Sequence, residues 1–548
     1  MNPDGSTTPL DLEGNALSEY PRTEYSYIDA ISQGLDPFGR VWKVTTPDGK
    51  ETETVYRGAD TTVTVKGVQG SGGTFDLTTR YYKDALGRLV EVSFPDGRYS
   101  SGATLPFDAA KAEYAYDTKD NLVGATLIAP DGTRQSRAFA YDGLNRLIRE
   151  DNPENGTTLY EEYDGLGNLL QKRDSTGNSL SMTYDPAGRL VKTQNGTVLL
   201  SQNIYDQVSE GTNPYGNSAG KLTTAQSYSD VGTLQITQRY YYSGLNGRLS
   251  GESTIFAEAP TTGEFKTQYA YDNFGLRTRS IHPNEGSGRL PRDLTATYRN
   301  GFQTGLRDTA PGGVTHVADI QYNPAGSIWK ITLPGGATDV LQPDPRNRPE
   351  KITMSGLLPG GGSATLYDSG LYVYDGAGNI TGIGPNSYRY DAANRLVQTL
   401  EYDNEHTIPY NLTWSYDPFG NLLQSTQQVA GNSPTSRSFT VLGNNRLAQM
   451  AEGASTTTFD YDGRGNLTRD ASHAFNYDLR NRVVGIDTYS GTEAPVPLGS
   501  FTYDSAGRRA VKTTEDASVY YVRDQQGQVL SEFRRPVSTY YTPAWDRD

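Results

Sequence analysis

A phrase of seven residues occurs three times between Tyr141 and Leu190, and it constrains the fold more than any other feature of the chain. The copies are Tyr141–Leu147, Tyr163–Leu169 and Tyr184–Leu190. Their tyrosines lie 22 and then 21 residues apart. Self-similarity at a fixed period of roughly 20–50 residues is typical of repeat architectures. The chain is therefore expected to be built from copies of one supersecondary unit.

Each phrase predicts the tip of a β-hairpin. Tyrosine favours a strand, where its ring packs on a pleated, half-buried surface. The aspartate after it can fold its carboxylate back onto backbone N–H groups and start a turn. The glycine or asparagine four residues after the tyrosine accepts a left-handed backbone at little cost. The leucine that ends the phrase then opens the next strand.

A second turn follows each phrase about ten residues later, as at Asp174–Gly177. After it, residues 179–184 alternate between hydroxyl side chains and larger apolar or aromatic ones, which is the pattern of a half-buried strand. Pro-Asp-Gly runs at 47–49, 95–97 and 130–132 predict the same opposite tips, because proline presets the first turn residue and glycine closes the turn. Each repeat therefore predicts two strands and two turns.

Further copies of the phrase return after residue 371, with Gly-Asn endings alternating with Asn-Arg endings. We interpret this alternation as a two-hairpin unit of roughly 42 residues, with successive tips at opposite edges. The residues predicted to form the structural repeat motif are Tyr141, Asp142, Tyr163, Asp164, Gly167, Tyr184, Asp185, Gly188, Tyr374, Asp375, Gly378, Tyr390, Asp391, Tyr416, Asp417, Gly420, Tyr461, Asp462, Gly465, Tyr477, Asp478, Tyr503, Asp504 and Gly507.

Three regions follow from this rhythm. Residues 1–34 are a polar N-terminal segment, 35–535 are one continuous repeat region whose rhythm loosens over 205–370, and 536–548 are a truncated lead-in to a missing core. Helical periodicity is nearly absent, so the predicted class is all-β with no substantial helix. Because only 35% of the residues are hydrophobic, we expect a large thin sheet that is wet on much of both faces.

The composition excludes several other classes of protein. A net charge of −15 without a basic stripe argues against nucleic acid as a partner. The absence of cysteine excludes disulfides and thiolate metal sites. No apolar run reaches the roughly 20 residues of a membrane helix. The N-terminus has no basic or apolar signal region, so we expect either a specialised export route or an excised fragment.

Eight copies fit the pattern Tyr-Asp-x-x-[Gly/Asn]-[Arg/Asn]-[Leu/Ile/Val] in full. This pattern resembles the YD-repeat, or Rhs, family of bacterial Rhs polymorphic toxins, insecticidal toxin complex C components, wall-associated relatives and animal teneurins. The resemblance covers roughly residues 35–535. It implies a spiral of hairpins that forms a curved sheet or hollow β-shell, and in the bacterial toxins such a shell encloses a C-terminal toxic polypeptide.

The resemblance extends to Tyr521–Leu530, which is similar to the segment leading into the family's terminal core. That core carries an Asp-Pro-x-Gly-Leu self-cleavage signature. The Asp-Pro-x-Gly runs of this chain, at 36–39, 185–188 and 417–420, are each followed by Arg or Asn. The self-cleaving aspartyl protease is therefore not carried over, and we expect no enzyme in this chain.

The residues themselves suggest no catalytic, cofactor-binding or metal site. The aspartates of the phrase share one turn position, so a single structural role explains them better than paired acid–base chemistry or calcium binding. The four histidines (His282, His316, His406 and His473) lack metal-ligand spacing, although a Ser-His-Asp triad of distant residues stays open. The glycine-rich residues 67–74 lack the ending of a phosphate-binding loop.

Two functions remain in view. The first is a shell segment that encloses and shields a C-terminal toxin or effector polypeptide before delivery, with that polypeptide and a delivery apparatus as partners. The alternative is a cell-surface adhesion or carbohydrate-binding module whose tyrosines stack on glycans. A structural role in which the tyrosines pack between neighbouring hairpins is favoured, because each tyrosine lies at a fixed distance from its turn. Either function implies a secreted or surface location.

Overall fold

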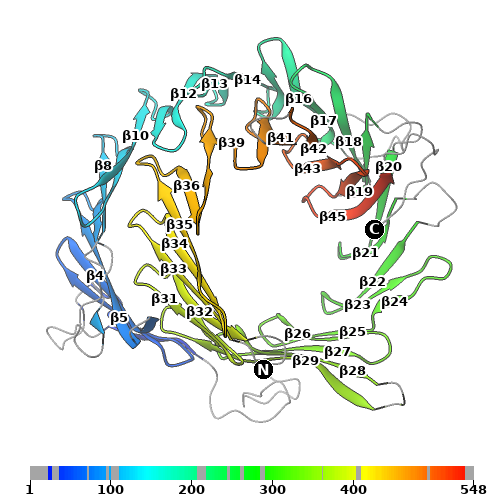
Figure 1. Ribbon diagram of the computed structural model, residues 1–548. Helices are drawn as coiled ribbons and strands as arrows, with labels where there is room; N and C mark the ends of the chain where they lie inside the picture. The colour runs from blue at the N-terminus through cyan, green and yellow to red at the C-terminus, as the bar shows by residue number, and fades with distance from the viewer. Residues whose placement is uncertain are drawn as a thin grey trace. The chain divides into compact units, whose positions relative to one another are not determined.

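The computed structural model describes residues 22–27, 36, 38–70, 73–93, 98–99, 110–206, 218–243, 247–258, 264–283, 291–358, 360, 362–402, 409–489 and 494–536. Every helix or strand within these ranges is a β-strand (Figure 1). The predicted all-β class of repeated antiparallel hairpins is confirmed. In the same ranges no helix could cross a membrane. The Pro-Asp-Gly at 95–97, most of the predicted segment 1–34 and nearly all of the predicted lead-in 536–548 lie outside the described residues.

The chain forms two compact units, and each unit combines two separate stretches of sequence. Unit 1 contains Met1–Ala138 and Asp319–Thr456, and unit 2 contains Phe139–Ala318 and Thr457–Asp548. The single continuous repeat region predicted for 35–535 stays a prediction.

The strands of unit 1 are β1 (Glu24–Ser26), β2 (Lys43–Thr45), β3 (Glu51–Arg57), β4 (Asp60–Gly70), β5 (Gly73–Lys83), β6 (Leu89–Ser93), β7 (Arg98–Tyr99), β8 (Lys111–Tyr116), β9 (Leu122–Ile128), β25 (Asp319–Tyr322), β26 (Ile328–Thr332), β27 (Thr338–Pro343), β28 (Pro349–Leu357), β29 (Ser363–Tyr374), β30 (Ile380–Ile383), β31 (Asn386–Tyr390), β32 (Leu396–Tyr402), β33 (Pro409–Tyr416), β34 (Leu422–Val429), β35 (Thr435–Val441) and β36 (Leu447–Glu452). Two strands carry the chain from one unit to the other, β10 (Arg134–Tyr141) and β37 (Ser455–Thr458).

The strands of unit 2 are β11 (Leu147–Asn152), β12 (Gly156–Tyr163), β13 (Leu169–Arg173), β14 (Ser179–Tyr184), β15 (Leu190–Asn195), β16 (Val198–Tyr205), β17 (Leu222–Tyr228), β18 (Leu234–Ser243), β19 (Arg248–Phe256), β20 (Glu264–Tyr271), β21 (Arg277–Ile281), β22 (Asp293–Arg299), β23 (Phe302–Asp308), β24 (Thr315–Val317), β38 (Asp460–Tyr461), β39 (Leu467–Arg469), β40 (His473–Tyr477), β41 (Val483–Thr488), β42 (Pro497–Tyr503), β43 (Arg509–Thr513), β44 (Ala517–Arg523) and β45 (Val529–Pro536).

Most strands pair antiparallel with the next strand in sequence, and the register slips at the motif tyrosine. In β14 and β15, Thr183 pairs with Lys192 but Tyr184 pairs with Leu190, so Val191 has no partner residue. The same slip occurs where β33 meets β34. An extra residue of this kind is a β-bulge, which bends the strand and increases its twist. Each repeat therefore adds one bend beside its turn.

In unit 1 the two stretches of sequence meet at β4 and the turn after β29. The backbone N–H of Gly376 donates to the carbonyl of Gly67 at 2.9 Å. One carboxylate oxygen of Asp375 accepts from the backbone N–H of Gln69 at 3.2 Å. Beside these bonds lies a small apolar cluster, which contains Val68, Phe75, Leu77 and Ala392.

We predict that Gly376→Ala destabilises unit 1 by about 1–3 kcal/mol, because it overfills this contact. A Cβ at residue 376 would lie 1.7 Å from the backbone oxygen of Lys66. Gly443 occupies the same place in a degenerate copy of the phrase and has nothing within 4 Å of an added Cβ, so Gly443→Ala is the matched control. Urea denaturation followed by circular dichroism measures the stability of both variants. Equal midpoints for the two variants would show that this backbone contact is not formed.

Unit 2 has the larger apolar core, formed where β18–β20 lie against β43–β45. Its buried members are Ile236, Phe256, Phe265, Ala510, Val511, Tyr520, Val522 and Phe533. The rings of Phe256 and Tyr520 meet edge to face with centroids 5.0 Å apart. Nearby, the Ser227 hydroxyl donates to the carbonyl of Tyr503 at 2.7 Å. This core holds residues 457–536 of unit 2 against its other stretch of sequence.

Candidate functional site

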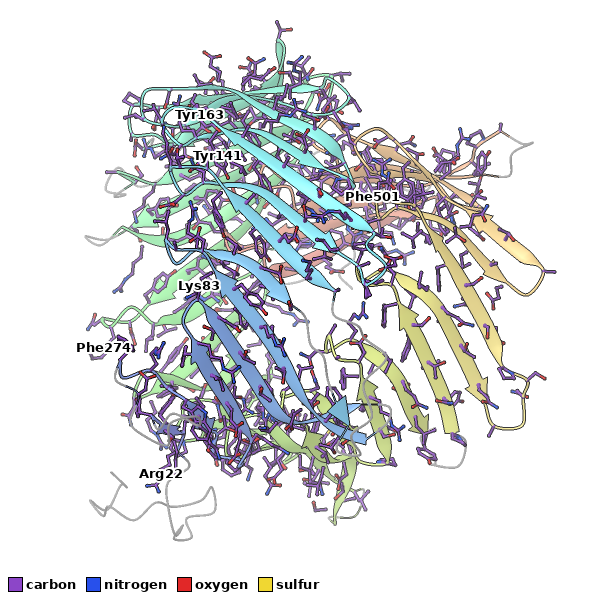
Figure 2. The ribbon with its side chains drawn as sticks, turned by 90° about the vertical axis from the view of Figure 1, so that its left-hand side faces the viewer. Arg22, Lys83, Tyr141, Tyr163, Phe274 and Phe501 are labelled. Atoms are coloured by element: carbon purple, nitrogen blue, oxygen red, sulfur yellow. The ribbon has the colours of Figure 1, made fainter. Side chains whose placement is uncertain are left out.

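The residues predicted to form the structural repeat motif all belong to one kind of turn, which recurs along the chain. Each motif tyrosine (Tyr141, Tyr163, Tyr184, Tyr374, Tyr390, Tyr416, Tyr461, Tyr477 and Tyr503) is the last residue of its strand. Figure 2 shows Tyr141 and Tyr163 at the ends of nearby strands of unit 2. The glycines at the left-handed position (Gly167, Gly188, Gly378, Gly420, Gly465 and Gly507) have φ between +75° and +93°. Three of the phrases use asparagine there instead, at Asn145, Asn394 and Asn481.

The motif aspartate closes its own turn. In the phrase that begins at Tyr163, the Oδ1 atom of Asp164 accepts from the backbone N–H groups of Leu166 and Asn168, at 2.9 and 2.8 Å. The Oδ2 atom accepts from the side chain of Asn168 at 2.8 Å. The pair of bonds to the residue four positions on recurs at Asp142, Asp164, Asp185, Asp375, Asp391, Asp417, Asp462, Asp478 and Asp504.

In the three copies between Tyr141 and Leu190, these bonds lower the pKa of the aspartate. Hydrogen bonds from Asn168 lower the pKa of Asp164 against the opposing effect of burial. In the copies that carry arginine, the N–H groups of Arg146 and Arg189 lower the pKa of Asp142 and of Asp185. A carboxylate with a lowered pKa is a hydrogen-bond acceptor and a weak source of protons near neutral pH. The geometry therefore gives these aspartates a role in turn formation.

Six of the motif tyrosines (Tyr163, Tyr374, Tyr390, Tyr416, Tyr477 and Tyr503) link their turn to the preceding one. The hydroxyl of Tyr416 donates to the carbonyl of Leu396, the residue that follows the preceding turn, at 3.0 Å. The guanidinium of Arg395, from that same turn, lies 4.8 Å from the centroid of the Tyr416 ring. Equivalent arginine–tyrosine stacks join Arg146 to Tyr163 and Arg482 to Tyr503. Both the ring and the hydroxyl of the tyrosine thus serve contacts between repeats.

The alternation of Gly-Asn and Asn-Arg endings in successive phrases does not reflect tips at opposite edges of the sheet. The side-chain amide of Asn379, in a Gly-Asn turn, donates to the side chain of Asn394, in the next turn, at 3.0 Å. The same contact joins Asn466 to Asn481 at 3.2 Å. Successive tips therefore lie side by side at one edge, and the prediction of opposite edges is wrong. The reason is that each repeat contributes two strands, which returns the chain to the same edge.

We predict that Tyr416→Phe lowers the stability of unit 1 by about 1 kcal/mol, because one hydrogen bond between repeats is lost while the stacked ring remains. Tyr367, which is 52% exposed in strand β29 of the same unit, provides the matched control Tyr367→Phe. Chemical denaturation of both variants checks this. A loss in the control as large as in Tyr416→Phe would contradict the role assigned to the hydroxyl.

The three histidines within the described residues do not lie together in one site. His282 contacts the carbonyl of Leu530 in unit 2, His316 lies in β24, and His406 is outside the described residues. His473 has Ser472 and Asp470 beside it, but both approach its Nδ1 atom, at 3.0 and 3.1 Å. A catalytic triad needs serine and aspartate on opposite ring nitrogens, so this trio lacks that geometry. In the part of the chain that the structure describes, no group of three or more acidic or histidine side chains could hold a metal ion.

Sequence reasoning missed a buried carboxyl group in unit 2. Glu252, in β19, is 4% exposed and accepts a hydrogen bond from the hydroxyl of Tyr269. Its Oε2 atom has no hydrogen-bond partner among the described residues. Burial, assisted by the negative charge of Asp524, raises the pKa of Glu252 to about 7, although the Tyr269 hydroxyl, the backbone of Gln525 and Arg277 oppose the shift. Glu252 has no place in the repeated phrase, and only its position in a strand rich in small and apolar residues could have drawn attention to it.

Comparison with known proteins identifies the repeated unit. The RHS Repeat family model matches residues 163–197, which contain the second and third copies of the phrase. These are RHS repeats. The resemblance to the Rhs/YD-repeat family is thereby confirmed. Among curated proteins, the "Double-stranded DNA deaminase toxin A" of Burkholderia cenocepacia (strain H111) is 26% identical over 526 residues. That match covers 93% of this chain and 32% of the relative.

Solved structures share the fold of this RHS-repeat chain. The crystal structure of TcdB2-TccC3 aligns with a TM-score of 0.75 and 16% identity, over 97% of this chain and 29% of that one. The crystal structure of TcdB2-TccC3-Cdc42 aligns with a TM-score of 0.76 and 16% identity, over 96% of this chain and 27% of that one. The chain spans 32% of the length of the Burkholderia cenocepacia relative and 29% of the TcdB2-TccC3 chain.

Proposed function

We propose that this RHS-repeat chain is part of the wall of a shell that encloses and shields a toxin or effector polypeptide. The observation that carries the proposal is the fold: nearly the whole chain aligns with the toxin-complex structure TcdB2-TccC3. A relative that matches across 93% of the chain is named a toxin. The enclosed polypeptide, a delivery apparatus and export by a specialised route are parts of this proposal.

The wall acts by separating its cargo from the surroundings. Nine motif turns are closed by their own aspartates, and tyrosines such as Tyr163, Tyr416 and Tyr503 tie turns to the preceding ones, so the repeats can extend a sheet without a thick apolar core. Most strand residues are only half-buried, and few large apolar side chains are fully buried. The enclosed polypeptide would stay inactive because the wall separates it from its targets until delivery.

The charge of the chain suits a basic cargo. The sequence carries 64 acidic against 49 basic residues, a net charge of −15. Relatives are named as a DNA deaminase toxin, probable deoxyribonucleases and a tRNA nuclease. Proteins that act on nucleic acid commonly carry positive charge, and opposite charges attract at the ionic strength of a cell over about 8 Å. We assign no reaction to the repeats themselves.

Glycan binding by the motif tyrosines receives no specific support. The ring of Tyr163 is stacked on Arg146 and that of Tyr503 on Arg482. A sugar would have to displace these guanidinium groups to reach the covered faces. That alternative stays a prediction.

Protease protection tests the proposal. The complete gene product that carries this chain is compared with a version in which residues 35–535 are deleted, and both are treated with a nonspecific protease. The remaining polypeptide is expected to survive at least tenfold longer in the presence of the repeats. Equal rates of digestion in the two proteins would end the proposal.

A further inference from the structure

A polar pocket in unit 2 lies outside everything described so far. Its volume is about 180 Å³, and its walls come from the strands and turn between β12 and β14 and from the turns after β38 and β40. Three basic side chains line it, Lys172, Arg464 and Arg480, against one lining carboxylate, Asp174. Such an excess of positive charge is unusual for a chain with a net charge of −15.

The half-buried side chain of Arg464 has no hydrogen-bond acceptor among the described residues. Its side chain is only 15% exposed. The nearest carboxylate oxygens, on Asp462 and Asp174, lie 3.6 and 3.8 Å from its nitrogens, beyond hydrogen-bonding distance. Its Nε atom is among the buried nitrogens without any partner. A guanidinium has five N–H donors, and leaving them unsatisfied when buried is costly.

The side chains of Arg480 and Lys172 also have fewer hydrogen-bond acceptors among the described residues than they have donors. The Nη atoms of Arg480 donate only to the carbonyls of Leu200 and Tyr228, each at 3.3 Å. Its Nε atom has no partner and lies 3.9 Å from a carboxylate oxygen of Asp478. The ammonium of Lys172 lies 5.5 Å from the centroid of the Tyr160 ring. No described carboxylate forms an ion pair with Lys172.

Four carboxylates lie near the pocket. Asp230 accepts from the backbone N–H of Leu479 at 2.8 Å, and the other three are engaged in their own turns. Asp174 accepts from Thr176 and Asn178, and Asp462 accepts from the backbone N–H groups of Arg464 and Asn466. Asp478 accepts from the side chain of Arg482 at 2.7 Å. These three are therefore held by short bonds to other donors and cannot close on the Arg464 and Arg480 guanidinium groups without opening a turn.

The electrostatics of Arg480 agree with this incomplete matching. Burial and, to a lesser extent, the neighbouring Arg482 lower its pKa to about 10, although Asp478 and Asp230 oppose them. An anion bound beside the guanidinium would offset both effects.

We propose that this pocket binds a small oxyanion, a phosphate or carboxylate group, between Lys172, Arg464 and Arg480. Both groups present planar or tetrahedral oxygens that match the donors of guanidinium. The site stands independently of the shell function, because it depends only on groups within unit 2. The oxyanion can be a free ion or a group carried by a larger molecule.

Isothermal titration of the chain with inorganic phosphate and with malonate, at constant ionic strength, tests the site. We expect saturable binding of at least one of the two, with a Kd below about 10 mM. Lys172→Gln and Arg464→Gln should each weaken it roughly tenfold, since each removes a charged hydrogen-bond donor. Arg149→Gln is the matched control, because Arg149 is an exposed arginine of unit 2 that is already paired with Asp151.

The two probes separate the chemistry of the oxyanion. Binding of phosphate alone identifies a phosphate site, and binding of malonate identifies a site that accepts carboxylates. Lys172→Gln removes no described hydrogen bond, so it keeps the test valid even where Arg464→Gln perturbs the fold. Absence of saturable binding by either probe, or equal affinity in the wild-type protein and both pocket variants, would overturn the proposal.

Discussion

Phe533→Ala is expected to lower the free energy of unfolding of unit 2 by about 3–5 kcal/mol, the usual cost of emptying a fully buried aromatic site. Phe533 lies in β45 with 0% exposure, and its ring centroid is 4.4 Å from that of Phe265 in β20. Phe265 and Phe533 belong to the two stretches of sequence that unit 2 joins. The cavity would therefore loosen the contact between those stretches as well as reduce apolar burial.

Phe302 supplies the control for this prediction, since it lies in the same unit and is 44% exposed. Phe302→Ala should change stability by less than about 1 kcal/mol. Hydrogen exchange at the amides of β43–β45 gives a local readout, which should accelerate in Phe533→Ala and not in Phe302→Ala. Similar stability losses in the two variants would mean that this cluster is not the core of unit 2.

The second prediction with a large expected effect is that the stability of unit 2 depends on pH through Glu252. Its pKa rises from an ordinary value of 4.5 to about 7 in the folded protein, mainly through burial. The folded state therefore holds a proton that the unfolded state has lost across this interval, and stability falls as pH rises from about 4.5 to 7. The shift corresponds to about 3 kcal/mol of stability lost over this window. Asp230 acts in the same direction, because burial also raises its pKa.

Glu252→Gln should abolish most of this slope and make unit 2 more stable than the wild-type protein at pH 8. Glutamine keeps a carbonyl oxygen that can accept from the Tyr269 hydroxyl but has no charge to bury. The turn aspartates act at lower pH, since hydrogen bonds from Arg40 hold the pKa of Asp36 at about 2. Urea midpoints measured between pH 4.5 and 8 make the comparison. An unchanged pH slope in Glu252→Gln would assign the effect to other groups.

The local structure of the turns was predictable because one seven-residue phrase recurs along the sequence. The phrase at Tyr163–Leu169 contains within seven residues the strand end, the turn aspartate and the left-handed glycine, so their geometry is settled by short-range chemistry. The fold class followed directly. The role of each tyrosine as a contact between repeats was favoured for the same reason, namely its fixed distance from the turn.

Contacts between distant stretches could not be predicted, because copies of one phrase look alike. Gly376, which meets the backbone of Lys66, and Gly165, which has nothing within 4 Å of an added Cβ, occupy the same place in two full copies of the phrase. Whether a glycine is tightly packed depends on which strands lie against it, and a local pattern does not carry that information. The burial of Glu252 and the unsatisfied Nε–H donor of Arg464 were missed for the same reason.

Cryo-electron microscopy of the complete gene product that carries this chain tests the central claim most directly. The account predicts RHS-repeat hairpins in a continuous wall around an interior, with density inside the wall that belongs to polypeptide and not to the sheet. A map in which the interior is filled by side chains of the wall, or in which the toxin or effector polypeptide lies folded outside it, would contradict the account.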